Sequence, residues 1–315
     1  MTSAWSEARQ DEIPPWSTDY PGLSRGASLS GSGDSPSVSV VIPALNEARN
    51  LREVFGRLPV DAEIILVDGN STDDTVRLAR ELRPDVVVVR QTRYGKGNAM
   101  ACGFAVASGD IVVTLDADGS ADPAEIPSFV AALVQGADFV KGTRFAHRGG
   151  SNDITLLRTL GNLFFCHLVN LLFHRRFTDL CYGYNAFRRD CLPMLGLMPG
   201  ETDGIRRHGD GFEIETLITL RATKACLRVT EVGSFEHKRL HGASNLNAGR
   251  DGMRVLRTIL VEWSENLTAR SRNRARWDGM LLSSPGQPVS TIVSQRRPGD
   301  LPHGRRRTTG ATEYA

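Results

Sequence analysis

The sequence DIVVTLDADG, at residues 110–119, decides the fold. Its first part, residues 110–115, contains a short apolar run that is typical of a buried β-strand. The run leads directly into Asp116 and Asp118, two carboxylates at the point where the strand ends. Mg²⁺ and Mn²⁺ are held by hard oxygen ligands, so this pair is a candidate metal site. The alternative is a simple turn, because Asp-Gly is also common in turns.

The segments that precede this strand alternate between two patterns. Three strands and three helices are predicted from them, at 38–42, 63–67 and 85–90 and at 46–58, 72–82 and 97–108, respectively. Valine-rich strands that alternate with helices are typical of a parallel α/β sheet. Ligands of such sheets bind beyond the carboxyl ends of the strands. The polar loops at 43–47 and 68–75 follow two of the strands and therefore belong to the predicted site.

The composition excludes some classes of function. The 315 residues include 38 Lys and Arg against 36 Asp and Glu, a net charge of +2. Proteins dedicated to nucleic acids usually have a strongly basic domain, so we expect no nucleic-acid partner. The five cysteines are odd in number and form no CxxC pair, which argues against a disulfide framework or structural zinc and favours a cytoplasmic location. We expect no signal peptide, because the N-terminus has no basic segment followed by an apolar stretch. We expect no membrane-spanning helix, because polar residues interrupt every stretch of about 20 residues.

The two ends of the chain differ in composition from its middle. Residues 1–36 are rich in Ser, Gly, Pro and Asp, which predicts a disordered leader. Residues 268–315 are predicted to be a disordered basic tail; from residue 270 onward the tail contains nine Arg against three acids, a net charge of +6. The part between them, 37–267, is predicted to be a single folded domain.

Two common nucleotide-binding motifs are absent from the sequence. GxGxxG does not follow the first predicted strand, and the P-loop pattern GxxxxGKS/T occurs nowhere. A Rossmann oxidoreductase and a P-loop NTPase are therefore disfavoured. A nucleotidyltransferase is an alternative α/β enzyme with a carboxylate-held metal. Its Gly-rich loop is not found after the first strand, where Pro43-Ala44-Leu45-Asn46-Glu47 stands instead.

Four motifs resemble the pattern of glycosyltransferase family 2, namely Pro43…Asn46-Glu47, Asp68-Gly69…Asp73, Gly95-Lys96-Gly97 and Asp116-Ala117-Asp118. The resemblance covers about residues 37–263, and later segments at 141–144, 179–188 and 239–245 are similar to dolichol-phosphate mannosyltransferase-like enzymes. It implies the GT-A fold, an α/β fold with a mostly parallel central sheet flanked by helices. It also implies a nucleotide-sugar donor and a divalent metal, Mg²⁺ or Mn²⁺. The nucleotide-binding half would be about 37–145 and the acceptor half about 146–267.

The resemblance also implies roles for individual residues. The nucleoside pocket would be lined by Pro43, Asn46, Glu47, Asp68 and Asp73. Lys96 would lie near the base or the phosphates, and Asp116 and Asp118 would hold the metal and the diphosphate. An acceptor phosphate would be bound by Arg144, Arg188, Arg239 and Ser244, because arginine binds phosphate with a planar fork. Asp118, Arg144 and Arg239 would be the catalytic residues.

The chain departs from the family pattern at two places. Ser120 stands two residues after the second aspartate, where the family often has Gln or another polar residue, which leaves a third protein ligand of the metal open. The late arginine motif ends in Ser244-Asn245 rather than Ser-Lys, so one positive charge for the acceptor phosphate is missing or comes from Lys238.

Residues 154–173 have leucine and phenylalanine at helical spacing. Arg158, Asn162, His167 and Asn170 interrupt the apolar pattern and oppose insertion across a bilayer. An interfacial helix is one interpretation, with the basic residues 174–176 at its end to meet anionic headgroups. An ordinary buried helix is the other. The first interpretation implies peripheral contact with the cytoplasmic face of a membrane.

Together these features predict an inverting, metal-dependent glycosyltransferase that acts on a polyprenyl phosphate at the membrane surface. Such an enzyme would serve the synthesis of cell-envelope polysaccharides or glycoconjugates. A family member with a soluble or saccharide acceptor and a non-enzymatic nucleotide- or membrane-binding module are the alternatives. Glu213 and Glu215 are candidate general bases, which a hydroxyl acceptor needs and a phosphate acceptor does not. The sequence specifies neither the nucleotide sugar nor the oligomeric state.

Overall fold

The computed structural model describes residues 35–201, 205–242 and 244–282, with side chains as far as residue 268. The predicted leader, except for its last two residues, and the tail from residue 283 onward lie outside the described residues. The last helix, α8 (Ala248–Leu282), continues past residue 267, where we expected the folded domain to end. The described residues up to Asn273 belong to one compact unit, and the end of α8 belongs to a second.

A seven-stranded sheet forms the centre of the first unit, in the order β3-β2-β1-β4-β7-β5-β8. The strands are β1 (Val38–Ala44), β2 (Glu63–Asp68), β3 (Val87–Arg90), β4 (Ile111–Thr114), β5 (Phe139–Thr143), β7 (Asn185–Arg188) and β8 (Val229–Gly233). Only β7 runs antiparallel to its neighbours β4 and β5; the other pairs are parallel. Two short strands, β6 (Gly150–Ser151) and β9 (Phe235–Glu236), form a separate parallel pair. This confirms the predicted mostly parallel sheet.

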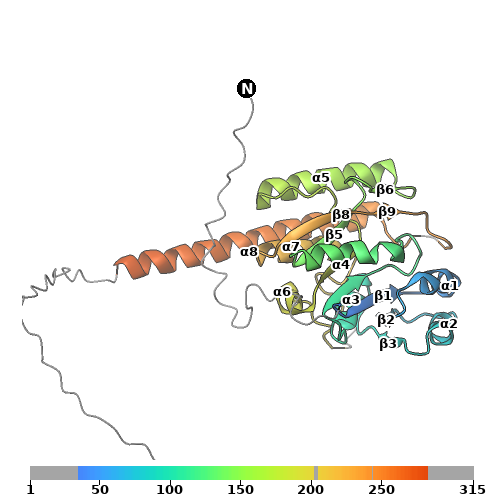
Figure 1. Cartoon of the computed structure of the whole chain (residues 1–315). Coiled ribbons are helices and arrows are strands. Elements are labelled where there is room, and N and C mark those ends of the chain that lie inside the picture. The colour runs from blue at the N-terminus through green and yellow to red at the C-terminus, as the bar shows by residue number, and fades with distance from the viewer. Residues whose placement is uncertain (1–34, 202–204, 243, 283–315) are drawn as a thin grey trace, which may run out of the picture. The chain divides into compact units, whose positions relative to one another are not determined.

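Helices cover both faces of the sheet (Figure 1). The helices before α8 are α1 (Ala48–Arg57), α2 (Thr75–Leu82), α3 (Lys96–Phe104), α4 (Ile126–Val134), α5 (Leu156–Phe173), α6 (Leu192–Leu195) and α7 (Ile214–Lys224). Buried residues of α1, α2 and α4 join one core cluster, and those of α3, α6 and α7 join another. A third cluster joins α5, α7 and α8.

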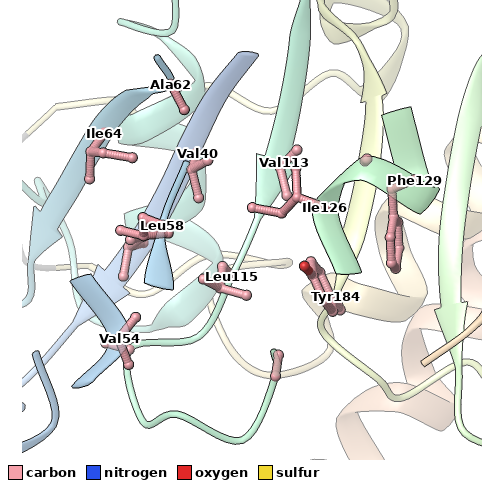
Figure 2. Packing of buried hydrophobic residues seen from close by; sticks show 14 of the residues in the cluster. Val40, Val54, Leu58, Ala62, Ile64, Val113, Leu115, Ile126, Phe129 and Tyr184 are labelled. Atoms are coloured by element: carbon pink, nitrogen blue, oxygen red, sulfur yellow. The ribbon is translucent and has the colours of Figure 1, made fainter. Parts of the chain in front are cut away.

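The two main clusters follow the alternation of side chains along the strands. Val40 and Ile42 of β1 face the first cluster, and Val41 between them faces the second. Figure 2 shows the first cluster, in which Phe129 of α4 stacks on Tyr184 with ring centroids 4.4 Å apart. Strands buried on both faces explain the near-continuous valine and isoleucine runs in the sequence.

Strand direction decides which loops meet. The loops after β1, β2 and β4 lie at one edge of the sheet because these strands are parallel. The antiparallel strand β7 brings its first residue, Asn185, to the same edge, where it pairs with Thr114 at the end of β4. Four strands therefore deliver polar segments to one place.

The segment around residues 209–210 crosses the start of α3 at very short range. A Cβ on Gly97 would lie 1.8 Å from the carbonyl oxygen of Gly209, and the Gly97 N–H donates to the carbonyl oxygen of Asp210 at 2.9 Å. The glycine beside Lys96 is thus required for the approach of the backbone that leads into α7. This contact brings the second half of the chain onto the first.

Two glycines give opposite expectations for stability. A Cβ on Gly103 of α3 would lie 2.3 Å from Cγ1 of Val41 and 2.9 Å from Cγ2 of Val67, so Gly103→Ala should lower the free energy of unfolding by about 1–3 kcal/mol. A Cβ on Gly56 of α1 meets nothing within 4 Å, so Gly56→Ala should raise it by about 0.5–1 kcal/mol. Urea unfolding followed by circular dichroism measures both. Equal effects of the two substitutions would contradict the packing of α3 on β1 and β2.

Candidate active site

A cavity of about 380 Å³ opens where β1, β2 and β4 end. The predicted site residues that line it are Pro43, Glu47, Lys96, Asp116, Asp118 and Arg239. Gln91, Phe212, Asn245 and Arg250 line it as well and were not among the predicted site residues. The cavity therefore brings together loops of the first half of the chain and segments close to α7 and α8.

Lys96 is part of the wall of the cavity, and its side chain lies between two carboxylates. Its Nζ is 2.7 Å from Oδ1 of Asp116 and 2.8 Å from Oε1 of Glu215. Burial by itself would lower the pKa of Lys96, but the charges of Asp116 and Glu215 outweigh burial and raise the pKa. Lys96 therefore stays cationic at any physiological pH.

Arg239 connects the loop after β1 to the loop after β4. One of its terminal nitrogens lies 3.0 Å from Oε1 of Glu47 and the other lies 2.8 Å from Oδ2 of Asp118. Burial raises the pKa of Glu47, although a hydrogen bond from Asn50 and the charge of Arg239 oppose this rise. The two predicted metal ligands are thus each paired with a basic side chain.

The segment that carries Arg239, residues 237–242, is attached to the aspartate loop through its backbone. The Leu240 N–H donates to the carbonyl oxygen of Asp118 at 3.1 Å, and the His237 N–H donates to that of Ser120 at 2.7 Å. Main-chain hydrogen bonds from two residues fix the segment beside the cavity. Arg239 is therefore placed by the local backbone as well as by its own ion pairs.

Three residues predicted for the nucleoside pocket organise the loops and do not line the cavity. Each accepts hydrogen bonds from backbone N–H groups: Asn46 from Thr72 at 2.7 Å, Asp68 from Ser71 at 3.0 Å, and Asp73 from Ala48 at 3.2 Å and Thr75 at 3.0 Å. Asp73 thus accepts from the first N–H group of α1 and of α2 and ties the starts of the two helices together. Contact of the three with a nucleoside stays a prediction.

Arg144 lies away from the cavity, in a buried ion-pair network. Its guanidinium binds Asp179 with two hydrogen bonds, at 2.7 and 3.0 Å, and Glu236 at 3.1 Å. Burial lowers the pKa of Arg144, and the two acids more than offset this effect. Arg144 thus links Asp179 to Glu236 of β9 and does not line the cavity, and its contact with an acceptor phosphate stays a prediction.

The structure also corrects the placement of Arg188 in the acceptor site. Arg188 is the last residue of β7 and pairs in register with Ile111, the first residue of β4. Because β7 is antiparallel, Arg188 lies at the opposite end of β4 from Asp116, and it forms an ion pair with Asp190 at 2.7 Å. Ser244 is exposed beside Asn245 and accepts a hydrogen bond from Arg158 at 3.3 Å.

Neither candidate general base lines the cavity. Glu213 is buried and its Oε1 accepts from the N–H groups of Gly209 and Gly211, both at 3.2 Å. Glu215 is buried between Lys96 and Asn185. A direct role in taking a proton from an acceptor is therefore not favoured by the geometry.

The aspartate pair suits a divalent cation. Asp116 and Asp118 both present hard carboxylate oxygens to the cavity, and both now bind basic groups, as expected for negative charge that needs a counter-ion. Among the described residues, no group of three or more His, Cys, Asp or Glu side chains could hold a metal ion. Within this part of the chain, a metal held here would take two carboxylates from the protein, and its other ligands would be diphosphate oxygens and water.

Comparison with known proteins gives the family. The sequence model described as Glycosyl transferase family 2 matches residues 39–194. An undecaprenyl-phosphate mannosyltransferase from Micrococcus luteus is 30% identical over 259 residues, which are 77% of this chain and 97% of that protein. An uncharacterized glycosyltransferase from Mycobacterium tuberculosis is 43% identical over 107 residues, or 34% of this chain. The chain spans about half, 48%, of the length of the latter relative.

Solved structures share the fold. A crystal structure of glucosyl-3-phosphoglycerate synthase from Mycobacterium tuberculosis, in complex with Mn²⁺, UDP and glucosyl-3-phosphoglycerate, matches this chain with a TM-score of 0.57. The match is 23% identical and covers 73% of this chain and 80% of that chain. With the sheet order and the nearly full-length match to the Micrococcus luteus enzyme, these findings confirm the predicted resemblance. The chain belongs to glycosyltransferase family 2 and has the GT-A fold.

Proposed function

We propose that this enzyme transfers a sugar from a nucleotide-diphosphate sugar to a polyprenyl phosphate, with inversion at the anomeric carbon. The observation that carries the proposal is a single cavity that holds two kinds of group. The carboxylates of Asp116 and Asp118 suit a metal-bound diphosphate, and the guanidinium groups of Arg239 and Arg250 suit an acceptor phosphate. The relatives support this assignment, since one of them is named an undecaprenyl-phosphate mannosyltransferase.

The donor side is formed by the first half of the chain. Asp116 and Asp118 would hold Mg²⁺ or Mn²⁺, which when bound stabilises the charge that develops on the departing diphosphate. A structural neighbour contains Mn²⁺ and UDP. Pro43 and Leu45 offer an apolar surface to the nucleobase, and Lys96 can donate to a phosphate oxygen. In the transfer, the bond between the anomeric carbon and the diphosphate oxygen breaks as an acceptor oxygen forms the new bond.

The acceptor side is formed by Arg239 and Arg250. Both guanidinium groups line the cavity, and planar guanidinium forks bind phosphate oxygens in pairs. A phosphate monoester is already an oxyanion, so it can attack without a general base. This agrees with the positions of Glu213 and Glu215 outside the cavity lining. Positioning of the phosphate for attack is then the main contribution of the two arginines.

Helix α5 supports a membrane-bound acceptor. Among the described residues it is the one helix long and apolar enough to cross a membrane by length and composition, yet only 22% of it is buried. Its exposed apolar side chains are Leu156, Leu157, Leu160, Leu163, Phe164 and Leu171. At helical spacing these side chains lie on one side of α5, and they form an apolar face suited to the interface of a bilayer. Arg158, in the first turn of α5 but on another side of the helix, donates to Ser244, next to Asn245 of the cavity, so the start of α5 lies near the acceptor side.

A soluble phosphorylated acceptor is the second candidate. The structural neighbour named above is a glucosyl-3-phosphoglycerate synthase, and its acceptor product carries a phosphate as well. Arg239 and Arg250 would bind a phosphate on either kind of molecule. The exposed apolar face of α5 favours the lipid.

Removal of one metal-binding carboxylate tests the donor site. Asp118→Asn should lower kcat/KM for sugar transfer by about a hundredfold or more, since it removes charge that holds the metal and diphosphate. EDTA should abolish the transfer, and Mn²⁺ should restore it. Asp190→Asn, which changes an acid at the other end of the sheet, should leave turnover within about twofold of wild type. Full activity of Asp118→Asn with Mn²⁺ present would contradict the assignment.

A panel of acceptors, together with one arginine variant and a matched control variant, tests the acceptor site. Undecaprenyl phosphate and 3-phosphoglycerate should be compared as acceptors, each with UDP-glucose, GDP-mannose and UDP-N-acetylglucosamine as the donor. We expect product with the lipid, and Arg250→Ala should raise its KM about tenfold or more through loss of a charge-assisted contact. Arg228→Ala, similarly exposed but paired with Asp138, is the control and should leave KM unchanged. Product with the soluble acceptor alone would favour the second candidate.

Charged substitutions on α5 test the membrane contact. The double variant Leu160→Glu/Phe164→Glu should weaken co-sedimentation with anionic vesicles at least about tenfold, because full burial of each apolar side chain contributes about 1.5–3 kcal/mol. Val60→Glu/Val134→Glu alters two exposed valines on other elements and should bind as wild type does. Equal binding by both double variants would contradict the interfacial role of α5.

A further inference from the structure

A buried group of charges lies directly behind the wall of the cavity. Lys96 contacts Asp116 on one side and Glu215 on the other, at 2.7 and 2.8 Å. The side chain of Asp116 is 34% exposed, whereas those of Lys96 and Glu215 are 13% and 4% exposed. Lys96 is therefore held between one carboxylate that faces the cavity and one that is closed off from it.

Glu215 is fixed by a chain of buried polar groups. It lies in the first turn of α7, and its second carboxylate oxygen accepts a hydrogen bond from the Asn185 amide at 2.9 Å. The amide oxygen of Asn185 lies 3.4 Å from Nζ of Lys141, which also donates to the carbonyl oxygen of Tyr182 at 3.0 Å. Lysine only donates, so the Asn185 oxygen faces Lys141 and its nitrogen faces Glu215. The position of Glu215 is thus determined from the centre of the sheet.

Gly183 shows how closely the cluster is fitted. A Cβ at this residue would lie 2.6 Å from Nζ of Lys96, 3.0 Å from Oε1 of Glu215 and 3.3 Å from Oδ2 of Asp116. The backbone of one residue therefore lies against all three charged groups. No side chain larger than hydrogen fits here without moving at least one of them.

Metal binding would change the partners within this cluster. A divalent cation at Asp116 competes with Lys96 for the same carboxylate, and a lysine that lost its only counter-ion at a buried site would be costly. Glu215 offers Lys96 a second carboxylate that does not face the cavity. With Glu215 present, Asp116 can exchange Lys96 for the metal without leaving a buried unpaired charge.

We propose that Glu215 is a positioning residue that keeps Lys96 paired while Asp116 binds the metal and the donor diphosphate. The inference rests on the proposed function and deepens it, because it gives Glu215 a role other than that of general base. Glu215 acts through Lys96 and touches neither substrate nor metal.

The experiment measures Mn²⁺ binding rather than turnover. The full chain is titrated with Mn²⁺ by calorimetry in the presence of UDP or GDP, whichever the wild type binds. Glu215→Gln should raise the Kd for Mn²⁺ about tenfold, the usual size of an effect that acts through a neighbour of a metal ligand. In the Lys96→Met background the same substitution should change the Kd by less than about twofold, because no cation is left for Glu215 to hold.

Glu213→Gln is the matched control, because Glu213 is a buried carboxylate two residues earlier that binds backbone N–H groups and not Lys96. It should keep the wild-type Kd within about twofold. Wild-type Mn²⁺ affinity in Glu215→Gln would overturn the inference. An equally large loss of Mn²⁺ affinity on Glu215→Gln in the Lys96→Met background, or on Glu213→Gln alone, would also overturn it. Either result would indicate general damage from the loss of a buried carboxylate.

Should Glu215→Gln fail to fold, Asn185→Ala takes its place, because it removes the hydrogen bond to Glu215 and leaves both charges. A smaller loss of Mn²⁺ affinity that disappears with Lys96→Met supports the inference, and an unchanged affinity overturns it. If the wild type binds Mn²⁺ and transfers sugar while these variants bind normally, only this inference fails. If the wild type binds no Mn²⁺ with either nucleotide, the proposed metal site fails with it.

Discussion

The position of β4 between a parallel and an antiparallel neighbour determines the composition of the site. Thr114, near the end of β4, pairs with Val41 of β1 on one side and with Asn185 of β7 on the other. The aspartates that follow β4 therefore meet the loop after β1 and the segment that precedes β7 at one point. If β7 ran parallel, Gly183 and Asn185 would lie at the other edge of the sheet, and Glu215 would have lost the amide that positions it.

The charges of the cavity are arranged for exchange of partners. Asp116 and Asp118 bind Lys96 and Arg239, so each acid already has a base beside it. In the proposed complex, a divalent cation would pair with the two acids, and phosphate oxygens of the donor and of the acceptor would pair with Lys96 and Arg239, respectively. Each acid would then exchange a basic side chain for the cation, and each base would exchange a carboxylate for phosphate oxygens. Such an exchange avoids burying unpaired charge at any step, which is the main electrostatic cost of binding in a partly closed cavity.

The fold and the placement of polar residues at the strand ends could be predicted from the sequence because their signals are local. Apolar runs that end in Asp-x-Asp or Asn-Glu place those residues at strand ends, and parallel strands align their ends without further information. The same local reasoning failed for Arg188, because its position depends on the direction of β7, which an apolar run does not encode. It also gave no indication of the ion pairs of Arg144, whose partners Asp179 and Glu236 are 35 and 92 residues away in the chain.

Other site residues carried no local signal at all. Arg250 lies in the first turn of α8 and reaches the cavity only through the tertiary position of that helix. The sequence pattern marks Glu215 only as a candidate base, because its contact with Lys96 depends on the crossing of the 209–210 backbone over Gly97. The Gly-Lys-Gly motif was the one signal that could have indicated this crossing, since two glycines around a lysine at a helix start imply a close backbone approach.

The helix α7 connects the cavity with the helices that carry the exposed apolar face. Its first turn holds Lys96 through Glu215, and its last turn is tied to α8 by ion pairs of Arg221 and Lys224 with Glu262, at 3.2 and 2.6 Å. The helix α8 in turn packs with α5, whose exposed leucines face outward. The cavity and the apolar face are thus connected through packed helices of one compact unit, and the length of this connection separates them. On a bilayer, this length would set how far above the hydrocarbon an acceptor phosphate must lie to reach the cavity.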